Sequence, residues 1–502
     1  MFLYMTSTPP KWLYFSMVAT GVFFATMDSS MVNIALPAIM AEFHSPLAHT
    51  EGVVLIYLLT TSATMLFWGH VSGRLGRQRV YTTGLLIFAL GSFLCSLAHS
   101  LPVMILFRFV QALGAAMMMA NGPAIIKTAF GSDQLGRSLG LMGIATSLGL
   151  MTGPVLGGFL IEYYSWRTLF MLPAPICIAV GLLAKTFLPR ETPPSRQEPF
   201  DWQGGFWWVA LLVIATSTLS HAADPQRSLA LLTGGTAVSA LALFFFLRRE
   251  SFLSTLAAAG DHSQPSAIIP AALVRKKALL IAVSTATMAF LCLFSVLILT
   301  PFYLDRVLGL PASRIGLVML AIPVTALVTA PLAGWLADYI EARIVATAGL
   351  LVCAIGLYSF TTLTGSSAPI WVAGRLGFFG VGLALFLSPN SASALRSIGE
   401  PHIGTVAALL ATARTLGMLM GIALVSLAFA LFFGHFSGGL DMKDYSGQQA
   451  DNFIKALRYS YICFLSIGIA AVFLSASRPK APEKNGAAKK DQPMAAPDDP
   501  EQ

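Results

Sequence analysis

Charged residues are scarce in this chain of 502 residues. Asp, Glu, Lys and Arg make up 11% of it, whereas soluble domains contain about 25%. Hydrophobic residues make up 56%, and apolar runs of about 20 residues, the length that a membrane-spanning helix needs, recur from end to end. These observations exclude an ordinary soluble domain and predict an all-α polytopic membrane protein. A transmembrane β-barrel would show short alternating segments, which this sequence lacks.

Several chemical signatures are also missing. The chain has no P-loop, no nucleophile elbow and no zinc-binding spacing, so we predict a protein that is not an enzyme and uses no cofactor or metal. All five cysteines fall inside apolar runs, which favours packing roles over disulfides or a metal site. No basic patch with interleaved aromatics lies outside the apolar runs, which argues against nucleic acid as a partner. The first apolar run has no cleavage site after it, so we expect a retained helix.

The apolar runs predict about fourteen spans. The first six lie at about 12–37, 53–71, 80–97, 101–126, 138–163 and 169–188, and a Pro-rich polar connection, 189–201, follows them. Two further spans lie at 202–219 and 228–247, and the last six at roughly 278–304, 314–338, 344–364, 368–390, 402–434 and 453–476. We therefore expect a six-helix bundle at 12–188, an inserted helix pair at 202–247, a second six-helix bundle at 278–476 and a disordered tail at 477–502.

The basic residues predict the orientation. Lys and Arg gather in the loops on one side of the predicted spans, whereas the other side has few. Because cytoplasmic loops of membrane proteins are enriched in Lys and Arg, an even number of spans places both termini in the cytoplasm. We expect a multi-pass protein of the cell (inner) membrane.

An internal repeat relates the two predicted bundles. GHVSGRLGRQR (69–79) lies between the second and third spans, and GWLADYIEAR (334–343) lies between the tenth and eleventh. Arg108 and Arg375 each stand in an apolar helix, the fourth and the twelfth span. Two related halves around a central cavity are the layout of many secondary transporters.

The stretch from Gly140 to Gly158 combines small residues with a proline. Gly149, Gly153 and Gly157 recur every fourth position, so they share one helix face, and such spacing allows two helix backbones to approach closely in a membrane. Pro154 removes a backbone donor and bends the helix. The stretch predicts a bent span packed against another helix. Ordinary tight packing is the alternative.

Asp28 is the acidic residue that lies well inside a predicted span. Intramembrane carboxylates are costly and usually mark a transport pathway. From the rise of a helix, Asp28 and Arg108 lie at similar depths, roughly 14 Å and 10 Å below the outer surface. A moving arginine would let Asp28 bind and release a proton. A static pair, or a tie between helices through Gln111, is the alternative.

In the order and spacing of these motifs, the chain resembles the major facilitator superfamily, and within it the fourteen-span drug:proton antiporters of the EmrB/QacA type. The resemblance covers nearly the whole chain except the tail, and it implies a major facilitator fold. It rests on MDSSMVNIALPAI in span one, the loop 69–79, Arg108, Gln111 and Gly114 in span four, and Gly404, Arg414, Gly417 and Gly421 in span thirteen. The stretch 140–158 is similar to the antiporter motif through Gly140, Gly149, Gly153, Pro154, Gly157 and Gly158.

The resemblance also implies a cytoplasmic gate, at Gly69, Arg74, Gly76, Arg77 and Asp338. The sequence departs from the family at Gly73, where the gating motif usually carries an acidic residue. The lock of the first half is therefore expected to be weaker or built differently.

The resulting hypothesis is a proton-coupled exporter of hydrophobic or cationic drugs, working by alternating access. Asp28 and Arg108 would couple protons, and the cavity would be lined in part by Asn33, Gln111, Asn121, Asn390, Arg375 and Arg414. The alternatives are a dedicated exporter of one metabolite, possibly anionic, and a membrane sensor that kept the fold without transport. The expected partners are a small-molecule substrate, protons and the lipid bilayer. Whether an outer-membrane or periplasmic adaptor takes part stays open.

Overall fold

The computed structural model of the protein describes residues 11–130, 135–189, 199–221, 229–259, 276–396, 403–440 and 449–479, with a few single positions between them. Its regular elements are helices: α1 (Lys11–Glu42), α2 (Leu47–Thr50), α3 (Gly52–Leu75), α4 (Arg77–Ser96), α5 (Leu101–Phe130), α6 (Leu135–Tyr163), α7 (Trp166–Met171), α8 (Pro173–Phe187), α9 (Trp202–His221), α10 (Leu229–Ala258), α12 (Lys277–Arg306), α13 (Ala312–Met319), α14 (Ala321–Tyr339), α15 (Ala342–Phe360), α16 (Pro369–Arg396), α17 (Ile403–Ser437) and α18 (Ala450–Ala476). Most of the 189–201 connection and of the tail predicted at 477–502 lies outside the described residues.

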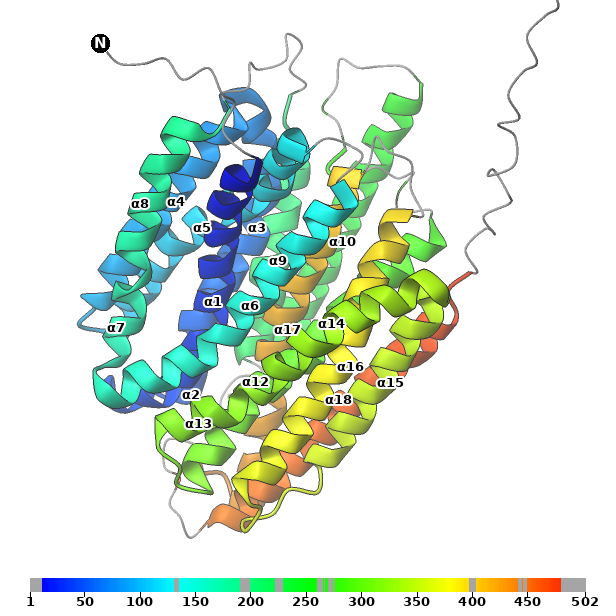
Figure 1. The fold of residues 1–502 in the computed structure, drawn as a ribbon. Coiled ribbons are helices and arrows are strands. Elements are labelled where there is room, and N and C mark those ends of the chain that lie inside the picture. The colour runs from blue at the N-terminus through cyan, green and yellow to red at the C-terminus, as the bar shows by residue number, and fades with distance from the viewer. Residues whose placement is uncertain are drawn as a thin grey trace, which may run out of the picture.

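The helices pack into two bundles that lie side by side (Figure 1). In the first bundle α1 packs on α5 and α6, and α4 packs on α5 and α8. In the second, α12 packs on α17 and α18, and α16 packs on α14 and α15. The bundles meet where α6 contacts α13 and α14, α3 contacts α17, and α1 contacts α12. We call this junction the seam.

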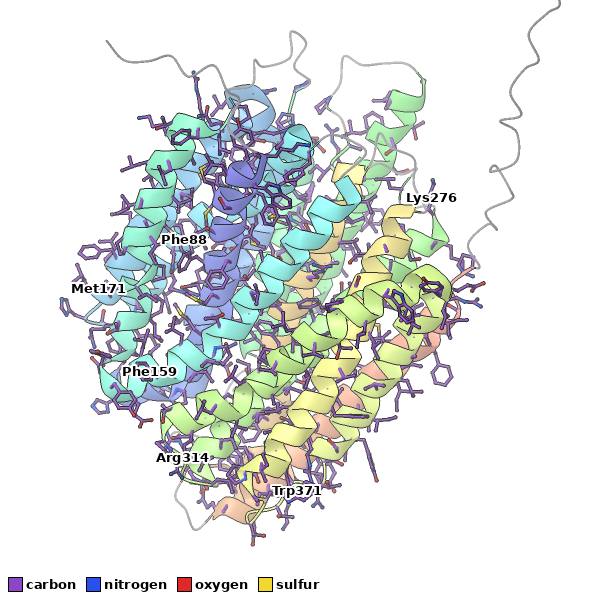
Figure 2. The ribbon with its side chains drawn as sticks, in the orientation of Figure 1. Phe88, Phe159, Met171, Lys276, Arg314 and Trp371 are labelled. Carbon is purple, nitrogen blue, oxygen red and sulfur yellow. The ribbon has the colours of Figure 1, made fainter. Side chains whose placement is uncertain are left out.

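The two ends of the molecule are named by their helices. At the lower end in Figure 1 lie α2, α7 and α13, and we call it the α2 end. α1 begins near the opposite end, which we call the N-terminal end. Lys276 lies towards the N-terminal end, and Arg314 and Trp371 lie at the α2 end (Figure 2).

The helix pair α9–α10 packs beside the seam. The two helices contact each other, and α9 also contacts α3 and α17. Trp208 fills an apolar cluster with Ala63 of α3 and Phe246 of α10, and its indole donates to the Ser62 carbonyl at 3.4 Å. The pair therefore touches both bundles through α9.

Eleven helical segments in the described residues are long and apolar enough to cross a membrane. α7 joins α8 in one such segment, and α13 joins α14 in another. The three other predicted spans lie in α6, α9 and α10, which do not meet these criteria in the described residues. The count of fourteen therefore stays a prediction.

The outer surface suits a lipid environment. Large apolar side chains such as Leu106, Phe159 and Leu332 are at least half exposed, and a surface of this kind would be a liability in water. Helices also satisfy their own backbone hydrogen bonds, as the bilayer requires. Aromatic residues are enriched where membranes meet water. Exposed ones occur near both ends of the molecule: Trp371 at the α2 end, and Tyr339 at the opposite end, where α14 finishes.

Candidate transport site at the seam

A fully buried polar cluster joins α1 to α5 in the first bundle. Nη1 of Arg108 donates to Asp28 Oδ2 at 2.5 Å and to Gln111 Oε1 at 2.8 Å. The amide of Gln111 donates to Asp28 Oδ1 at 2.9 Å. Arg108 and Asp28 are both fully buried. The structure thus brings together the two residues predicted to couple protons, and it joins to them Gln111, which was predicted to line the cavity.

Helix α3 holds the other side of the Arg108 guanidinium. The Nε atom of Arg108 donates to the carbonyl of Val53, in the first turn of α3, at 3.1 Å. The guanidinium also lies over the Tyr57 ring, 4.3 Å from the centroid, and Tyr57 donates to the Ala25 carbonyl of α1 at 2.8 Å. One arginine therefore connects three helices, α1, α3 and α5.

This cluster has the physical properties that proton exchange needs. A buried ion pair is balanced only while both partners are present, and removing one leaves a buried charge at a cost of about 3–5 kcal/mol. A carboxylate that loses its cation in an apolar site is therefore expected to bind a proton. Any movement of α5 relative to α1 changes the distance between these partners and hence the charge that Asp28 can hold.

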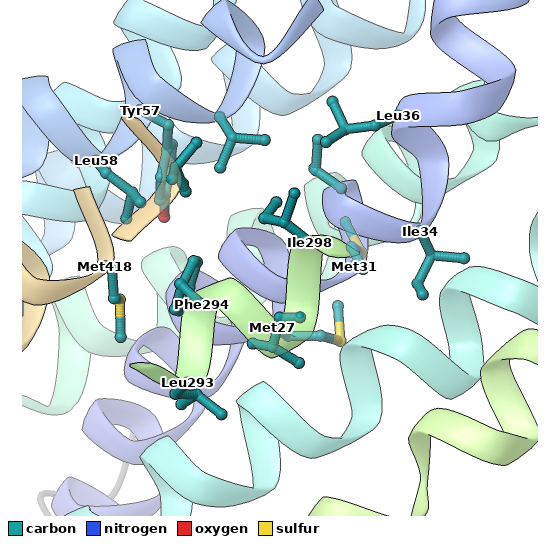
Figure 3. Close-up of a cluster of buried hydrophobic side chains, with 14 of the residues drawn as sticks. Met27, Met31, Ile34, Leu36, Tyr57, Leu58, Leu293, Phe294, Ile298 and Met418 are labelled. Carbon is teal, nitrogen blue, oxygen red and sulfur yellow. The ribbon is translucent and has the colours of Figure 1, made fainter. Parts of the chain in front are cut away.

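The centre of the seam next to the cluster is apolar. Side chains from both bundles meet there: Met27, Met31, Ile34 and Leu36 of α1, Tyr57 and Leu58 of α3, Leu293, Phe294 and Ile298 of α12, and Met418 of α17 (Figure 3). Met27 precedes Asp28 in the chain, so the ion pair lies beside this contact between bundles. Methionine adapts to irregular shapes, so these side chains can fill the contact between the two bundles.

The two asparagines predicted to line the cavity in the first bundle, Asn33 and Asn121, are buried and bonded within their own helices. The Asn33 amide donates to the Ser29 carbonyl at 3.5 Å, and the Asn121 amide donates to the Met117 carbonyl at 2.7 Å. The carbonyl oxygens of both side chains are buried without a partner in the described part of the chain. Each asparagine thus retains a free acceptor.

The predicted cavity residues of the second bundle form no carboxylate pair among the described residues. Arg414 donates to the Ser391 hydroxyl at 2.8 Å, and its Nε is buried without a partner there. Nη1 of Arg375 is likewise buried and unpartnered. Asn390 donates to the Ala282 carbonyl at 3.0 Å and accepts from Arg478 at 2.5 Å, so it ties α12, α16 and the end of α18 together.

The small residues of α6 serve two different interfaces. A Cβ atom on Gly153 would lie 2.8 Å from the Met27 carbonyl of α1, and Gly149 and Gly157 also face α1. Gly158 instead lies against Ala312 and Gly316 of α13, across the seam. The stretch packs tightly as predicted, but most of its glycines serve contacts inside the first bundle. Gly140 lies in α6, and its surroundings fall outside the described contacts.

Pro154 and Glu162 extend the contact of α6 with α13. A Cβ atom on Gly316 would meet the Pro154 carbonyl at 2.8 Å, and the Glu162 carboxylate accepts from the Ser313 backbone N–H at 2.8 Å. Glu162 is exposed. The backbones of α6 and α13 therefore approach each other closely towards the α2 end of the seam, and a side chain of α6 bonds to the first turn of α13.

The predicted gate lies at the N-terminal end, between α3 and α4. Gly69 and Gly73 have open space where a Cβ would stand, and Gly76 begins α4 with a positive φ of 90° that favours glycine. Arg74 and Arg77 flank this turn. Asp338 lies in α14, and its side chain is outside the described contacts.

Sequence reasoning missed four buried charged residues, Glu51, Asp201, Glu250 and Arg478. Glu51, before the first turn of α3, is 1% exposed, and Arg478, just after α18, is 2% exposed. Both were taken as lying outside the spans. The available signal for Glu51 was its position directly before an uninterrupted apolar run, with no basic neighbour in the sequence.

Comparison with known families decides the identity of the fold. A family model described as the Major Facilitator Superfamily matches residues 18–422. The chain belongs to the major facilitator superfamily. Membership makes this protein a multi-pass membrane transporter rather than an enzyme, and it confirms the family and the fold class predicted from the sequence.

Individual members of the superfamily are similar over most of the chain. The riboflavin transporter RibZ of Clostridioides difficile is 32% identical over 420 residues, which are 84% of this chain and 88% of that protein. The multidrug resistance protein Stp of Mycobacterium tuberculosis is 29% identical over 426 residues, 83% of this chain and 75% of that protein. A crystal structure of a bacterial homologue of the human lysosomal transporter Spinster has the same fold, with a TM-score of 0.65, 14% identity and coverage of 94% of this chain and 97% of that one.

Proposed function

We propose that this transporter is a proton-coupled exporter of hydrophobic or cationic compounds. The observation that carries the proposal is the fully buried pair of Asp28 and Arg108 beside the contact between the two bundles. Ionisable residues inside a membrane are costly, and those that occur there usually mark a transport pathway. The similarity to a multidrug resistance protein supports the export of drug-like compounds.

The proposed cycle uses movement of the bundles against each other. The bundles comprise residues 12–188 and 278–476, with the pair 202–247 between them and both termini in the cytoplasm, so the α2 end faces outwards. When α5 shifts, Arg108 leaves Asp28, and Asp28 takes up a proton. When the pair forms again, the proton leaves. Export of one substrate is thus linked to entry of protons in the opposite direction.

The test is drug-driven proton movement in vesicles. Purified protein is reconstituted with a pH-sensitive dye inside the vesicles, and the pH gradient is followed while ethidium or another cationic dye is transported. We expect Asp28→Asn to abolish the coupled pH change, while Asp28→Glu keeps part of it. Normal proton-driven dye transport by Asp28→Asn contradicts the proposal.

A dedicated exporter of one anionic metabolite is the second candidate. Two observations favour it: Arg375 and Arg414 have buried, unpartnered nitrogens in the second bundle, and the chain is similar to a transporter of riboflavin. Cells with and without the protein separate the two candidates. Equal accumulation of a panel of cationic dyes in both, together with lower retention of an anionic compound such as riboflavin 5′-phosphate, favours the second.

A further inference from the structure

Glu51 is a buried carboxyl group that crosses the seam. It lies between α2 and α3 in the first bundle and is 1% exposed. Its Oε2 is hydrogen-bonded to the Ser426 hydroxyl of α17 in the second bundle. Its Oε1 has no partner in the residues that the structure describes. The contact is therefore a polar link between the bundles, and neither Asp28 nor Arg108 takes part in it.

The hydrogen-bond count at Ser426 indicates which partner carries the proton. A serine hydroxyl has one proton to donate and can also accept. Ser426 donates to the Ile422 carbonyl at 2.8 Å, the bond that serines commonly make inside helices. The Ser426 hydroxyl lies within hydrogen-bond distance of both Glu51 and the Ile422 carbonyl, and its one proton can serve only one of them at a time. When that proton goes to Ile422, a protonated Glu51 donates the bond to Ser426 as a carboxylic acid.

The surroundings of Glu51 favour the same form. The site is lined by apolar side chains: Ile298, Leu299, Phe302, Val425 and Phe429. An ionised carboxylate in such a site costs several kcal/mol unless it is paired and fully hydrogen-bonded. Glu51 precedes the α3 span, and its burial raises the pKa of its carboxyl to about 8. A bond donated by Ser426 to the ionised carboxylate lowers that pKa, whereas a bond that Ser426 accepts from the protonated acid favours the protonated form.

No cation on the neighbouring helices is paired with Glu51 in the described residues. The charged residues and histidines of those helices are Lys11, Asp28 and Glu42 on α1, His49 on α2, Arg108 and Lys127 on α5, Lys277, Asp305 and Arg306 on α12, and Arg414 and His435 on α17. Lys11 and Lys277 are the first residues of their helices, and Lys127 lies in the last turn of α5. Arg108 pairs with Asp28, Arg306 with Asp305, and Glu42 with Arg167. Arg414 hydrogen-bonds Ser391.

We propose that Glu51 is a second proton-binding residue, which keeps its proton while α3 and α17 are in contact and releases it to water when the seam opens at the α2 end. This proposal rests on the proposed function in one respect only, namely that the seam opens during transport. Closure of the α2 end then requires a proton on Glu51, whatever the state of Asp28.

The two proton sites are connected through the first turn of α3. Arg108 holds the Val53 carbonyl, two residues after Glu51, and Glu51 ties the same turn to α17. Separation of α3 from α17 therefore removes the Glu51 contact and displaces a hydrogen-bond partner of Arg108. Opening of the α2 end is in this way transmitted to the Asp28 pair.

The test measures the width of the α2 end as a function of pH. The exposed Cys463 is first changed to Ser, which leaves four buried cysteines. Spin labels are then attached at positions 164 and 371, exposed sites on the first and second bundles. Pulsed electron paramagnetic resonance on the full chain in lipid nanodiscs gives the distance distribution. We expect the long-distance population to grow as pH rises through the range in which Glu51 loses its proton.

Three variants decide the outcome. Glu51→Gln, which is always neutral, is expected to keep the short distance at every pH, whereas Asp28→Asn is expected to keep the pH-dependent change. Ser426→Ala is expected to move the midpoint of the change to lower pH, because the protonated acid loses its acceptor. This third variant provides a test even where Glu51→Gln fails to fold.

Any of three results overturns the proposal. The first is a distance that does not vary with pH. The second is the same pH dependence in Glu51→Gln as in the parent protein, or its loss in Asp28→Asn. The third is a midpoint that moves to higher pH in Ser426→Ala, which would show that Ser426 donates to an ionised Glu51. None of these depends on which substrate is exported or on whether Asp28 couples its transport.

Discussion

The buried arginines of the two bundles differ in the partners that surround their guanidinium groups. Arg108 of the first bundle has a carboxylate partner, a carbonyl and an aromatic ring around its guanidinium. Arg414 of the second bundle donates to the Ser391 hydroxyl, and its guanidinium carbon lies 5.9 Å from the centroid of the Phe290 ring. Arg375 has an unpartnered nitrogen in the described part of the chain. Bundles that resemble each other in sequence pattern are thus unlike in charge balance.

The difference separates two kinds of chemistry. A carboxylate that is paired with an arginine can exchange that cation for a proton, so the first bundle is suited to coupling. An uncompensated arginine offers donors to an incoming anion or carbonyl group, so the second bundle is suited to recognising substrate. Four substitutions, taken from the largest expected effect to the smallest, test this division.

Loss of the Arg108 side chain should cause the largest damage. Arg108→Ala leaves Asp28 buried without its cation, so we expect the free energy of unfolding to fall by about 3–5 kcal/mol. Thermal melting in detergent measures the loss. The double variant Asp28→Asn/Arg108→Gln removes both charges and should recover much of the stability while transport stays inactive. Equal melting of the single and double variants would show that the pair does not balance its charges.

Substitution of Gly153 should disturb the first bundle directly. A leucine there meets the Met27 carbonyl and the Met31 amide at 2.8 Å from its Cβ alone, so α6 and α1 are forced apart beside Asp28. We expect a loss of about 1–3 kcal/mol and no coupled transport, measured by melting and vesicle assays. Gly374→Leu is the control, because Gly374 has open space around it. Normal coupling in Gly153→Leu would show that this contact is only packing.

Neutralisation of Arg414 should change selectivity more than stability. Arg414→Gln keeps a donor for Ser391 and leaves no carboxylate unpaired, so we expect melting to change by no more than about 1 kcal/mol. If the second bundle recognises anions, transport of an anionic compound falls about tenfold, equivalent to about 1.4 kcal/mol, while that of cationic dyes is retained. A parallel loss for both kinds of substrate argues against the division between bundles.

Restoration of the acidic residue in the gate should have the smallest effect. Gly73 has open space around it, so Gly73→Asp is expected to change stability by no more than about 0.5 kcal/mol. If the lock between the bundles is weak at this position, the added carboxylate slows opening of the N-terminal end and lowers the export rate. Gly73→Ala, which adds bulk without charge, should export normally. Equal rates in both variants would place the lock elsewhere.

Much of the site followed from residue type and helical spacing. The scarcity of charge made Asp28 conspicuous, and the depth of Arg108 in its helix made contact between them possible. Glu51 was missed because its exposure depends on α17, more than 370 residues later in the chain. Gly149, Gly153 and Gly157 were predicted to share one face of their helix, and all three face α1, whereas the contact of the adjacent Gly158 with α13 could be seen only in the structure.

The sequence by itself determined a bundle of apolar helices and the family to which the chain belongs, because hydrophobic length and short motifs act locally along the chain. Only the tertiary structure decided which polar groups neutralise each other. A buried charge is stabilised by whatever lies within a few ångströms of it, and those neighbours come from α1, α3 and α5 in one bundle and from α16 and α17 in the other. That packing accounts for the pairing of Arg108 with Asp28, for the bond of Arg414 to Ser391 rather than to any carboxylate of the described residues, and for the link from Glu51 to Ser426.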